Sequence, residues 1–353
     1  MEQQLDYKGF WEWFLTKERD FYEIVKSRSQ EAIEKDFFDH IASRLSQINE
    51  GYYFLTGMSD DSTAELVLTA DGEIRNVVFI EELIEAAPQL EHWKFTALKP
   101  AMDIKNVNVT MGDYQFIKDN IFFYSNEQEE YPDEIDLVFV YDGNVGNKDA
   151  ITTGVCIFLD NFLGELNFAT QIDTFAVIGR DQAQKELIPI EKLKDFLLWR
   201  EREFTEKYKT VKRDDIEEKF SILRATLGNE KPLIACMNLP LLNYEAKASY
   251  PWISVLKFNY NGENNDGLPE KEDFEKLGDI EDKAVEDLKE KGYLYIGRET
   301  ADNSKESYFA GKDFREISKV FKIIKDSNPE YNISFRIFKD KYWQYFKYYN
   351  NAV

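Results

Sequence analysis

The N-terminal part of the chain carries apolar residues every three or four positions, which is the spacing of one face of an α-helix. This spacing predicts a helix over 10–25 and a second one over 33–48, with Ser29 as its N-cap. The period then changes to the alternation typical of strands at 52–57 and 64–70, with a polar turn between them. We therefore expect two helices followed by a β-hairpin.

Helix and strand patterns alternate through the middle of the chain. The predicted elements are, in order, a helix at 76–87, a strand at 93–98, a meander of antiparallel strands over 104–141, a helix at 151–166, a strand at 172–178 and a charged helix at 190–212. The end of the last helix is polar and loses the apolar period, so we place a domain boundary near residue 215. This boundary separates an N-terminal α+β region at 1–215, which a split near residue 100 could divide further, from a C-terminal domain at 216–353.

The C-terminal domain has the clearest pattern. Strand, helix, strand, strand, helix and strand signals follow one another at 252–260, 271–291, 293–297, 306–310, 314–326 and 332–338. The order β-α-β-β-α-β is that of a ferredoxin-like sandwich, in which two helices cover one face of an antiparallel sheet. A further strand at 232–239 is expected beside it, which gives four or five strands. The predicted fold class is therefore α+β, with antiparallel sheets and helices.

Two features of the C-terminal domain lead to specific packing predictions. In the helix at 271–291, the apolar spacing predicts that Phe274, Leu277, Ile280, Ala284 and Leu288 point inward. The tail at 341–350 carries six aromatic residues. In solvent such a segment would expose a large apolar patch. We therefore expect it to dock as a strand on its own domain or on a partner.

The net charge of the chain limits the classes of molecule that it can bind. The chain has 353 residues, and its 67 acidic residues outnumber its 44 basic ones, which gives a formal net charge of -23. This field repels phosphate backbones and argues against nucleic-acid binding. No apolar stretch reaches the roughly 18 residues of a membrane span, and the N-terminus has no signal-peptide pattern. We expect a cytoplasmic protein without a membrane span, with a basic protein as its possible partner.

Motifs for chemistry are missing from the sequence. The two histidines, His40 and His92, have no partner at catalytic spacing, and the cysteines and histidines lack zinc-site spacing. The glycines of 142–148 do not have the spacing of a phosphate-binding loop. Cys156 and Cys236 each lie in an apolar run, so we expect reduced, buried thiols. The sequence therefore predicts no catalytic residue, no metal site and no cofactor.

Carboxylates that interrupt apolar runs or occupy the first hairpin turn are the remaining binding candidates. They are Asp60, Asp61, Asp160, Glu165 and Asp173. Charge beside a core costs free energy unless it is paired or used. We therefore favour a structural pairing with Lys94 or Lys99 over a binding role for these carboxylates.

The segment 222–340 resembles a bacterial family, the domain of unknown function 695. The resemblance is carried by paired apolar strands around Trp252, by the turn NDGLP at 265–269 leading into an acidic helix, and by the strand YIGRET that follows. Blocks of the N-terminal part are similar to a region that accompanies this domain in some bacterial proteins. The resemblance implies a bacterial cytosolic protein and supplies no activity.

Two functional hypotheses remain. The leading one is a non-enzymatic protein-binding or regulatory protein, of an inhibitor-like or immunity-like kind, that recognises its partner through a sheet edge or an acidic face. The alternative is a hydrolase that uses carboxylates and a divalent cation. The sequence does not predict the oligomeric state.

Overall fold

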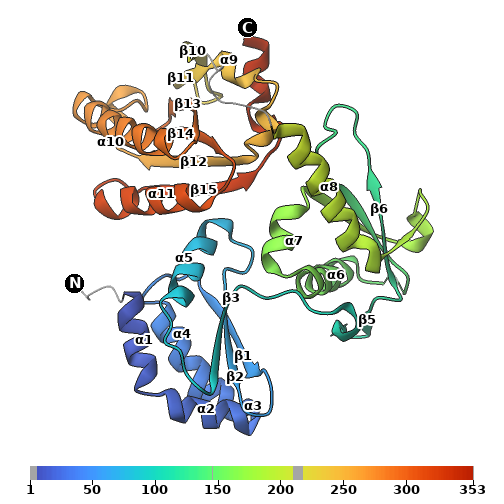
Figure 1. Ribbon diagram of the computed structural model, residues 1–353. Helices are drawn as coiled ribbons and strands as arrows, with labels where there is room; N and C mark the ends of the chain where they lie inside the picture. Colours follow the sequence, from blue (N-terminus) through green and yellow to red (C-terminus); the bar gives the residue numbers. More distant parts are fainter. Residues whose placement is uncertain (1–5, 145, 210–217, 353) are drawn as a thin grey trace. The chain divides into compact units, whose positions relative to one another are not determined.

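The structure, a computed structural model, describes residues 6–144, 146–209 and 218–352 (Figure 1). Contacts within the chain divide it into two compact units. Unit 1 comprises Met1–Asn126 and Ile135–Leu198, and unit 2 comprises Glu127–Glu134 and Trp199–Val353. The domain boundary predicted near residue 215 lies outside the described residues. No helix in the described part of the chain is long and apolar enough to cross a membrane.

The first part of unit 1 is a three-stranded sheet with helices packed against it. Its elements are α1 (Tyr7–Leu15), α2 (Glu18–Ser27), α3 (Gln30–Ala32), a π-helical segment (Ile33–Phe38), α4 (Asp39–Leu45), β1 (Tyr53–Met58), β2 (Ala64–Thr69), α5 (Ile74–Glu85) and β3 (Trp93–Ala97). Ser29 caps α3 as predicted, because its Oγ accepts a hydrogen bond from the Ala32 amide. The rings of Phe14 and Phe37 both pack on Trp93, which joins the helices to β3.

The second part of unit 1 contains a four-stranded sheet in the order β8-β7-β6-β9 and a separate two-stranded sheet, β4-β5. The elements are a 3-10 turn (Ile104–Asn106), β4 (Val109–Met111), β5 (Tyr114–Phe116), β6 (Ile121–Asn126), β7 (Asp136–Tyr141), α6 (Lys148–Leu163), α7 (Glu165–Gln171), β8 (Thr174–Gly179), 3-10 turns (Arg180–Gln182 and Ile190–Lys192), β9 (Ile188–Pro189) and the start of α8 (Leu193–Tyr208). The residues of α8 from Trp199 onward belong to unit 2. Gly154 in α6 is required by packing, because a Cβ there would lie 2.0 Å from the Phe116 ring.

The predicted meander at 104–141 forms two antiparallel pairs, β4-β5 and β6-β7, and unit 1 also contains two parallel pairs that were not predicted. β2 pairs with β3 in parallel, and β7 pairs with β8 in parallel. In both cases a helix lies between the two strands along the chain, and such a crossover returns the second strand in the same direction. The other pairs, β1-β2, β4-β5, β6-β7 and β6-β9, are antiparallel.

Unit 2 is built on a six-stranded sheet in the order β10-β11-β13-β14-β12-β15, in which all neighbouring strands are antiparallel. Its elements are β10 (Phe220–Thr226), β11 (Pro232–Asn238), α9 (Leu239–Leu242), 3-10 turns (Lys247–Ser249 and Glu263–Asn265), β12 (Trp252–Asn259), α10 (Lys271–Glu290), β13 (Leu294–Ala301), β14 (Ser304–Gly311), α11 (Arg315–Ser327), β15 (Ser334–Lys339) and a C-terminal 3-10 helix (Gln344–Ala352). The structure confirms the α+β class. The ferredoxin-like assignment of the C-terminal domain stays a prediction.

The sheet of unit 2 is wider than the predicted four or five strands, because β10 adds a strand at the edge. β10 pairs with β11 over its whole length, but most of its side chains are exposed, so it carries little of the apolar pattern from which strands are predicted.

The row of buried residues along α10, its inward stripe, also differs from the prediction. Phe274 is 61% exposed, and the buried positions are Leu277, Glu281, Ala284 and Leu288.

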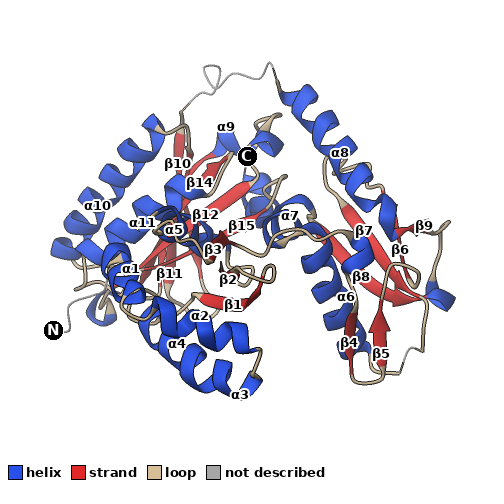
Figure 2. Ribbon diagram, turned by 60° about the horizontal axis from the view of Figure 1, so that its bottom comes forward, coloured by secondary structure: helices blue, strands red, loops and turns tan. Residues whose placement is uncertain are grey.

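The two faces of this sheet are covered by different elements (Figures 1 and 2). α10 and α11 pack against each other on one face, where Phe321 of α11 contacts Phe309 of β14. α9 and the C-terminal helix cover the other face, where Trp343 and Phe346 join a cluster of buried apolar residues that includes Val255. The aromatic tail is therefore packed, as predicted. It forms a helix instead of the expected strand, since the Asp340 carboxylate accepts hydrogen bonds from the amides of Gln344 and Tyr345.

Removing the tail should destabilise unit 2. Deletion of 341–353 takes two almost fully buried rings, those of Trp343 and Phe346, out of the core. Each contributes about 1.5–3 kcal/mol, against a total stability of about 5–15 kcal/mol. We expect a lower midpoint of urea unfolding, or aggregation. The substitution Tyr348→Ala is the control, because that side chain is 78% exposed. An unchanged midpoint for the deletion would contradict the prediction.

A second prediction concerns Asp133, which holds the loop Glu127–Glu134 within unit 2. Its carboxylate accepts hydrogen bonds from Lys207 Nζ at 2.8 Å and from the hydroxyls of Tyr208 and Tyr342 at 2.7 Å. Burial raises the pKa of Asp133, but these hydrogen bonds outweigh it and the pKa is lowered. A carboxyl with a lowered pKa stabilises the fold above its ordinary pKa and loses that contribution as the pH falls through the lowered value.

The substitution Asp133→Asn should therefore lower the urea midpoint at neutral pH, and the difference from the wild type should shrink toward acid pH. Unfolding curves over a pH series measure this. Glu130→Gln in the same loop is a matched control, because Glu130 is exposed. A difference that does not change with pH would show that the charge of Asp133 contributes nothing.

Candidate functional site

The structure divides the five predicted carboxylates into two groups. Asp60 and Asp61 lie in the turn between β1 and β2. The Asp60 carboxylate accepts hydrogen bonds from the amides of Ser62 at 2.7 Å and Thr63 at 2.8 Å. The bonds from Ser62 in particular hold the pKa of Asp60 below its ordinary value. Asp60 thus shapes an exposed turn, away from the pocket that the other candidates line.

Asp160, Glu165 and Asp173 line one pocket of about 440 Å³ in unit 1. Asp160 on α6 binds Lys99 Nζ at 2.9 Å. Burial raises the pKa of Asp160 by more than Lys99 lowers it. Burial also lowers the pKa of Lys99, but the hydrogen bond and charge of Asp160 outweigh this and the pKa of Lys99 is raised. The pairing with Lys99 that the sequence offered as a structural alternative is present.

Glu165 has a structural position in this pocket. Gly164 ends α6 with a φ of 82°, a conformation that favours glycine, and the turn brings Glu165 to the start of α7. The buried Glu165 carboxylate accepts hydrogen bonds from Thr69 Oγ1 at 2.6 Å and from the Lys99 amide at 3.1 Å. Asp173 accepts one from the Ile135 amide at 2.7 Å. Among the described residues, no group of three or more His, Cys, Asp or Glu side chains could hold a metal ion.

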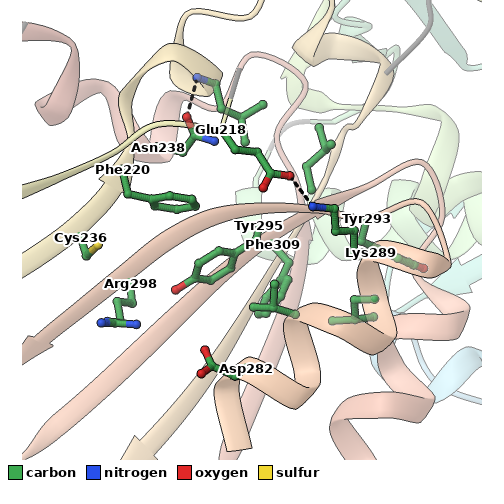
Figure 3. Close-up of a pocket in the computed structure, with 14 residues that line it drawn as sticks. Glu218, Phe220, Cys236, Asn238, Asp282, Lys289, Tyr293, Tyr295, Arg298 and Phe309 are labelled. Atoms are coloured by element: carbon green, nitrogen blue, oxygen red, sulfur yellow. Dashed lines mark hydrogen bonds and ion pairs between the residues drawn. The ribbon is translucent and has the colours of Figure 1, made fainter. Parts of the chain in front are cut away.

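A larger pocket, of about 580 Å³, lies in unit 2 (Figure 3). α10 contacts β13 and β14, whereas β10 and β11 continue the sheet beyond this helix. The side chains of β10 and β11 on the helix side therefore form a pocket wall together with the flank of α10. The Phe220 ring lies 5.6 Å from that of Tyr295, centre to centre. At one end of the pocket, Lys289 of α10 binds Glu218 at 2.8 Å.

The floor of this pocket is organised by a buried carboxylate, that of Glu281 on α10, which is only 1% exposed. One of its oxygens accepts hydrogen bonds from the Tyr295 hydroxyl at 2.8 Å and from Ser307 Oγ. The other binds Arg298 Nη1 at 2.7 Å and Lys305 Nζ at 2.9 Å. Burial raises the pKa of Glu281, but the charges of Lys305 and Arg298 outweigh it and the pKa is lowered. Glu281 is therefore a paired, ionised carboxylate.

A β-bulge in β13 brings the partners of Glu281 together. Alternation along a regular strand would put Tyr295 and Arg298 on opposite faces. The register with β14 shifts between Tyr295 and Gly297, and both side chains then reach Glu281. Gly297 has a φ of 148°, and a Cβ there would lie 2.3 Å from the Cys236 carbonyl oxygen. Only glycine fits this position.

Cys236 lies on β11 directly opposite Arg298 and lines the same pocket. Both cysteines are free, as predicted, but each is only partly buried. The prediction of buried thiols was therefore wrong. Cys236 lines the pocket beside α10, which leaves its side chain partly accessible.

Sequence reasoning missed this pocket, although two signals for it were present. Glu281 falls four residues after Leu277 and three before Ala284, on the inward stripe of α10. A carboxylate at such a position needs buried partners. Gly297 within a strand pattern is a signal for a bulge.

Residues 221–349 match the model of a family of unknown function, DUF695. The match covers the sheet of unit 2 from the second residue of β10 onward and includes Glu281, Arg298 and Cys236, whereas Glu218 and Phe220 of the pocket lie just before it. It confirms the resemblance predicted for this segment and names no activity. Neither a curated protein nor a solved structure matches the chain at a significant level.

The Glu281 cluster lies in the DUF695 segment, the residues 221–349 that match this family model. Mutation of the cluster should cause a large loss of stability. In Glu281→Ala, Arg298 and Lys305 lose their shared buried counter-charge, which costs about 3–5 kcal/mol. Urea unfolding of the full chain measures this. Asp282→Asn is the matched control, since Asp282 is the next residue on the same helix and is exposed, and exposed substitutions change stability by about 0.5 kcal/mol or less. Equal midpoints for the two variants would refute a structural role for Glu281.

Proposed function

We propose that this chain is a non-enzymatic regulatory protein that binds a small organic ligand in the pocket of its DUF695 segment. The observation that carries the proposal is the pocket itself, of about 580 Å³. Ligand sites of about 300–1,000 Å³ are typically mostly apolar with a few well-placed polar groups. Here Phe220, Phe309 and Leu288 supply apolar surface, and Arg298 and Asn238 supply polar groups.

The side chains of this pocket favour binding over chemical conversion. Cys236 is its only thiol among the described residues, and no histidine lines it. Burial raises the pKa of Tyr295 above its ordinary value, so the hydroxyl stays protonated and donates to Glu281. Glu281 itself is engaged on both oxygens. Tyr295 and Glu281 are therefore engaged in structural hydrogen bonds and are not available as a general base.

A second candidate, binding of a basic protein partner, is favoured by the pocket in unit 1. Four carboxylates, those of Asp71, Asp160, Glu165 and Asp173, line it, and the apolar side chains of Ile157 and Phe175 beside them are exposed. A lysine or arginine side chain could place its charge among the carboxylates and its stem on the apolar surface. The net charge of -23 would also attract such a partner.

The alternative hydrolase would use Asp160 and Glu165. These carboxylates are bound by Lys99 and Thr69 respectively, which favours a structural role. The hydrolase remains testable, because it predicts turnover that requires a divalent cation and is lost in Asp160→Asn.

The proposed function predicts stabilisation of the protein without turnover. The purified full chain would be screened against a library of metabolites for a raised unfolding temperature, and product formation would be assayed in parallel with divalent cations present. A ligand at about 100 times its dissociation constant stabilises by about 2.7 kcal/mol. In a Cys156→Ser background, a ligand of the pocket should also slow the labelling of Cys236 by iodoacetamide. Turnover of a library compound, or no compound that protects Cys236, would contradict the proposal.

A further inference from the structure

We infer that the pocket of the DUF695 segment binds an organic oxyanion, a carboxylate or phosphate on an aromatic or apolar body, with its oxygens on Arg298 and its body against Phe220. This inference rests on the proposed function and specifies the chemistry of the ligand.

The Arg298 guanidinium has hydrogen-bond donors that no described residue uses. Glu281 fixes Nη1, and this is the only hydrogen bond that the guanidinium makes with the described residues. Nε and Nη2 therefore remain as donors on a planar group, the arrangement that binds a carboxylate or phosphate through two parallel hydrogen bonds. The Arg298 side chain is 33% exposed, so it is accessible from the pocket while most of its surface is shielded from water.

The ion pairs of Glu281 also favour an anion at Arg298. This single carboxylate serves two basic side chains, Arg298 and Lys305. Lys305 is buried and also donates to the Leu277 carbonyl. Of the two, only Arg298 lines the pocket. The charge of Asp282 also acts on Lys305. Arg298, however, has no ion-pair partner besides Glu281 among the described residues, and a ligand anion can supply one.

The other charged groups of the pocket define where an anion can sit. Asp282 lies beside Glu281 on α10 and points toward the same end of the pocket as Arg298 (Figure 3). Its negative charge opposes an anion there. Lys289 lies two turns further along α10, about 10 Å at about 1.5 Å per residue, and is paired with Glu218. The Arg298 end is therefore the anion position, and Asp282 limits its affinity.

Exposed apolar side chains lie on the same face of the sheet as Arg298. Phe220 is 40% exposed although its ring lies near that of Tyr295, and Ile222 on the same strand is 70% exposed. Residues directly opposite each other on neighbouring strands point to the same face. Ile222 lies opposite Cys236, and Cys236 lies opposite Arg298. The exposed apolar side chains and the guanidinium are thus on one face, suited to a ligand that is apolar at one end and anionic at the other.

The test compares matched probes on the full-length wild type. Phenylacetate and phenyl phosphate carry the oxyanion on an aromatic ring, whereas phenylacetamide keeps the ring and the shape without the charge. Affinities are measured by calorimetry, and occupancy by protection of Cys236 in the Cys156→Ser background. We expect at least one of the anions to bind about tenfold or more tightly than the amide. The stronger of the two anions identifies the source of the oxyanion.

Three variants test whether the anion binds at Arg298. Arg298→Gln, which removes the positive charge, should abolish the preference for the anion, and Arg298→Lys should keep part of it. Asp282→Asn should strengthen anion binding severalfold, and it changes an exposed side chain, so folding is not at issue. If Arg298→Gln does not fold, the wild-type comparison and Asp282→Asn decide the matter.

Equal affinity for the amide and both anions, with Cys236 protected by all three, would overturn the anion inference and leave the proposed ligand pocket intact. Failure of all three probes to bind or to protect Cys236 would overturn the inference as well. A wild-type preference that persists in Arg298→Gln and does not change in Asp282→Asn would place the anion elsewhere and overturn it too.

Discussion

The burial of the Glu281 carboxylate is the constraint around which unit 2 is arranged. A carboxylate withdrawn from water is stable as an ion only when hydrogen bonds and opposite charges replace its hydration. Here the replacements come from Tyr295 and Arg298 of β13 and from Lys305 and Ser307 of β14. These bonds fix the position of α10 across two strands. They also explain the bulge at Gly297, since without it Tyr295 and Arg298 could not both face the helix.

Because the sheet is six strands wide, a pocket lies next to this buried cluster. Two helices cover one face of the six-stranded sheet, but on that face Phe220 and Ile222 of β10 are exposed and Cys236 of β11 is only partly buried. On the opposite face, α9 and the aromatic tail cover the equivalent apolar surface, and Trp343 is fixed there by a hydrogen bond to the Tyr250 carbonyl at 3.0 Å. The uncovered region therefore lies on the helix side, next to Arg298. The pocket follows from a difference in coverage between the two faces.

Sequence patterns predicted most elements but not how they combine. Helices and strands were predictable because the apolar period depends on the local backbone, as in α6, α10 and the β1-β2 hairpin. The parallel pairs β2-β3 and β7-β8 depend on crossovers, and β10 is held by its neighbour and not by its own apolar face. Of the candidate carboxylates, three share a pocket, but nothing local marks Glu281 apart from the other acidic residues of α10 except its place on the inward stripe.

The position of Arg298 also explains how an acidic protein can present a site for an anion. With a net charge of -23, a fully exposed cation is surrounded by carboxylates and water, and its field is screened within about 10 Å at moderate salt. A guanidinium in a recess is different, because a lower local dielectric strengthens its interaction with a group that enters the recess. Glu281 holds this guanidinium through one nitrogen, so Nε and Nη2 of a side chain that lines the pocket make no hydrogen bond with the described residues. The carboxylate that stabilises the fold is thus also the group that orients the proposed binding residue.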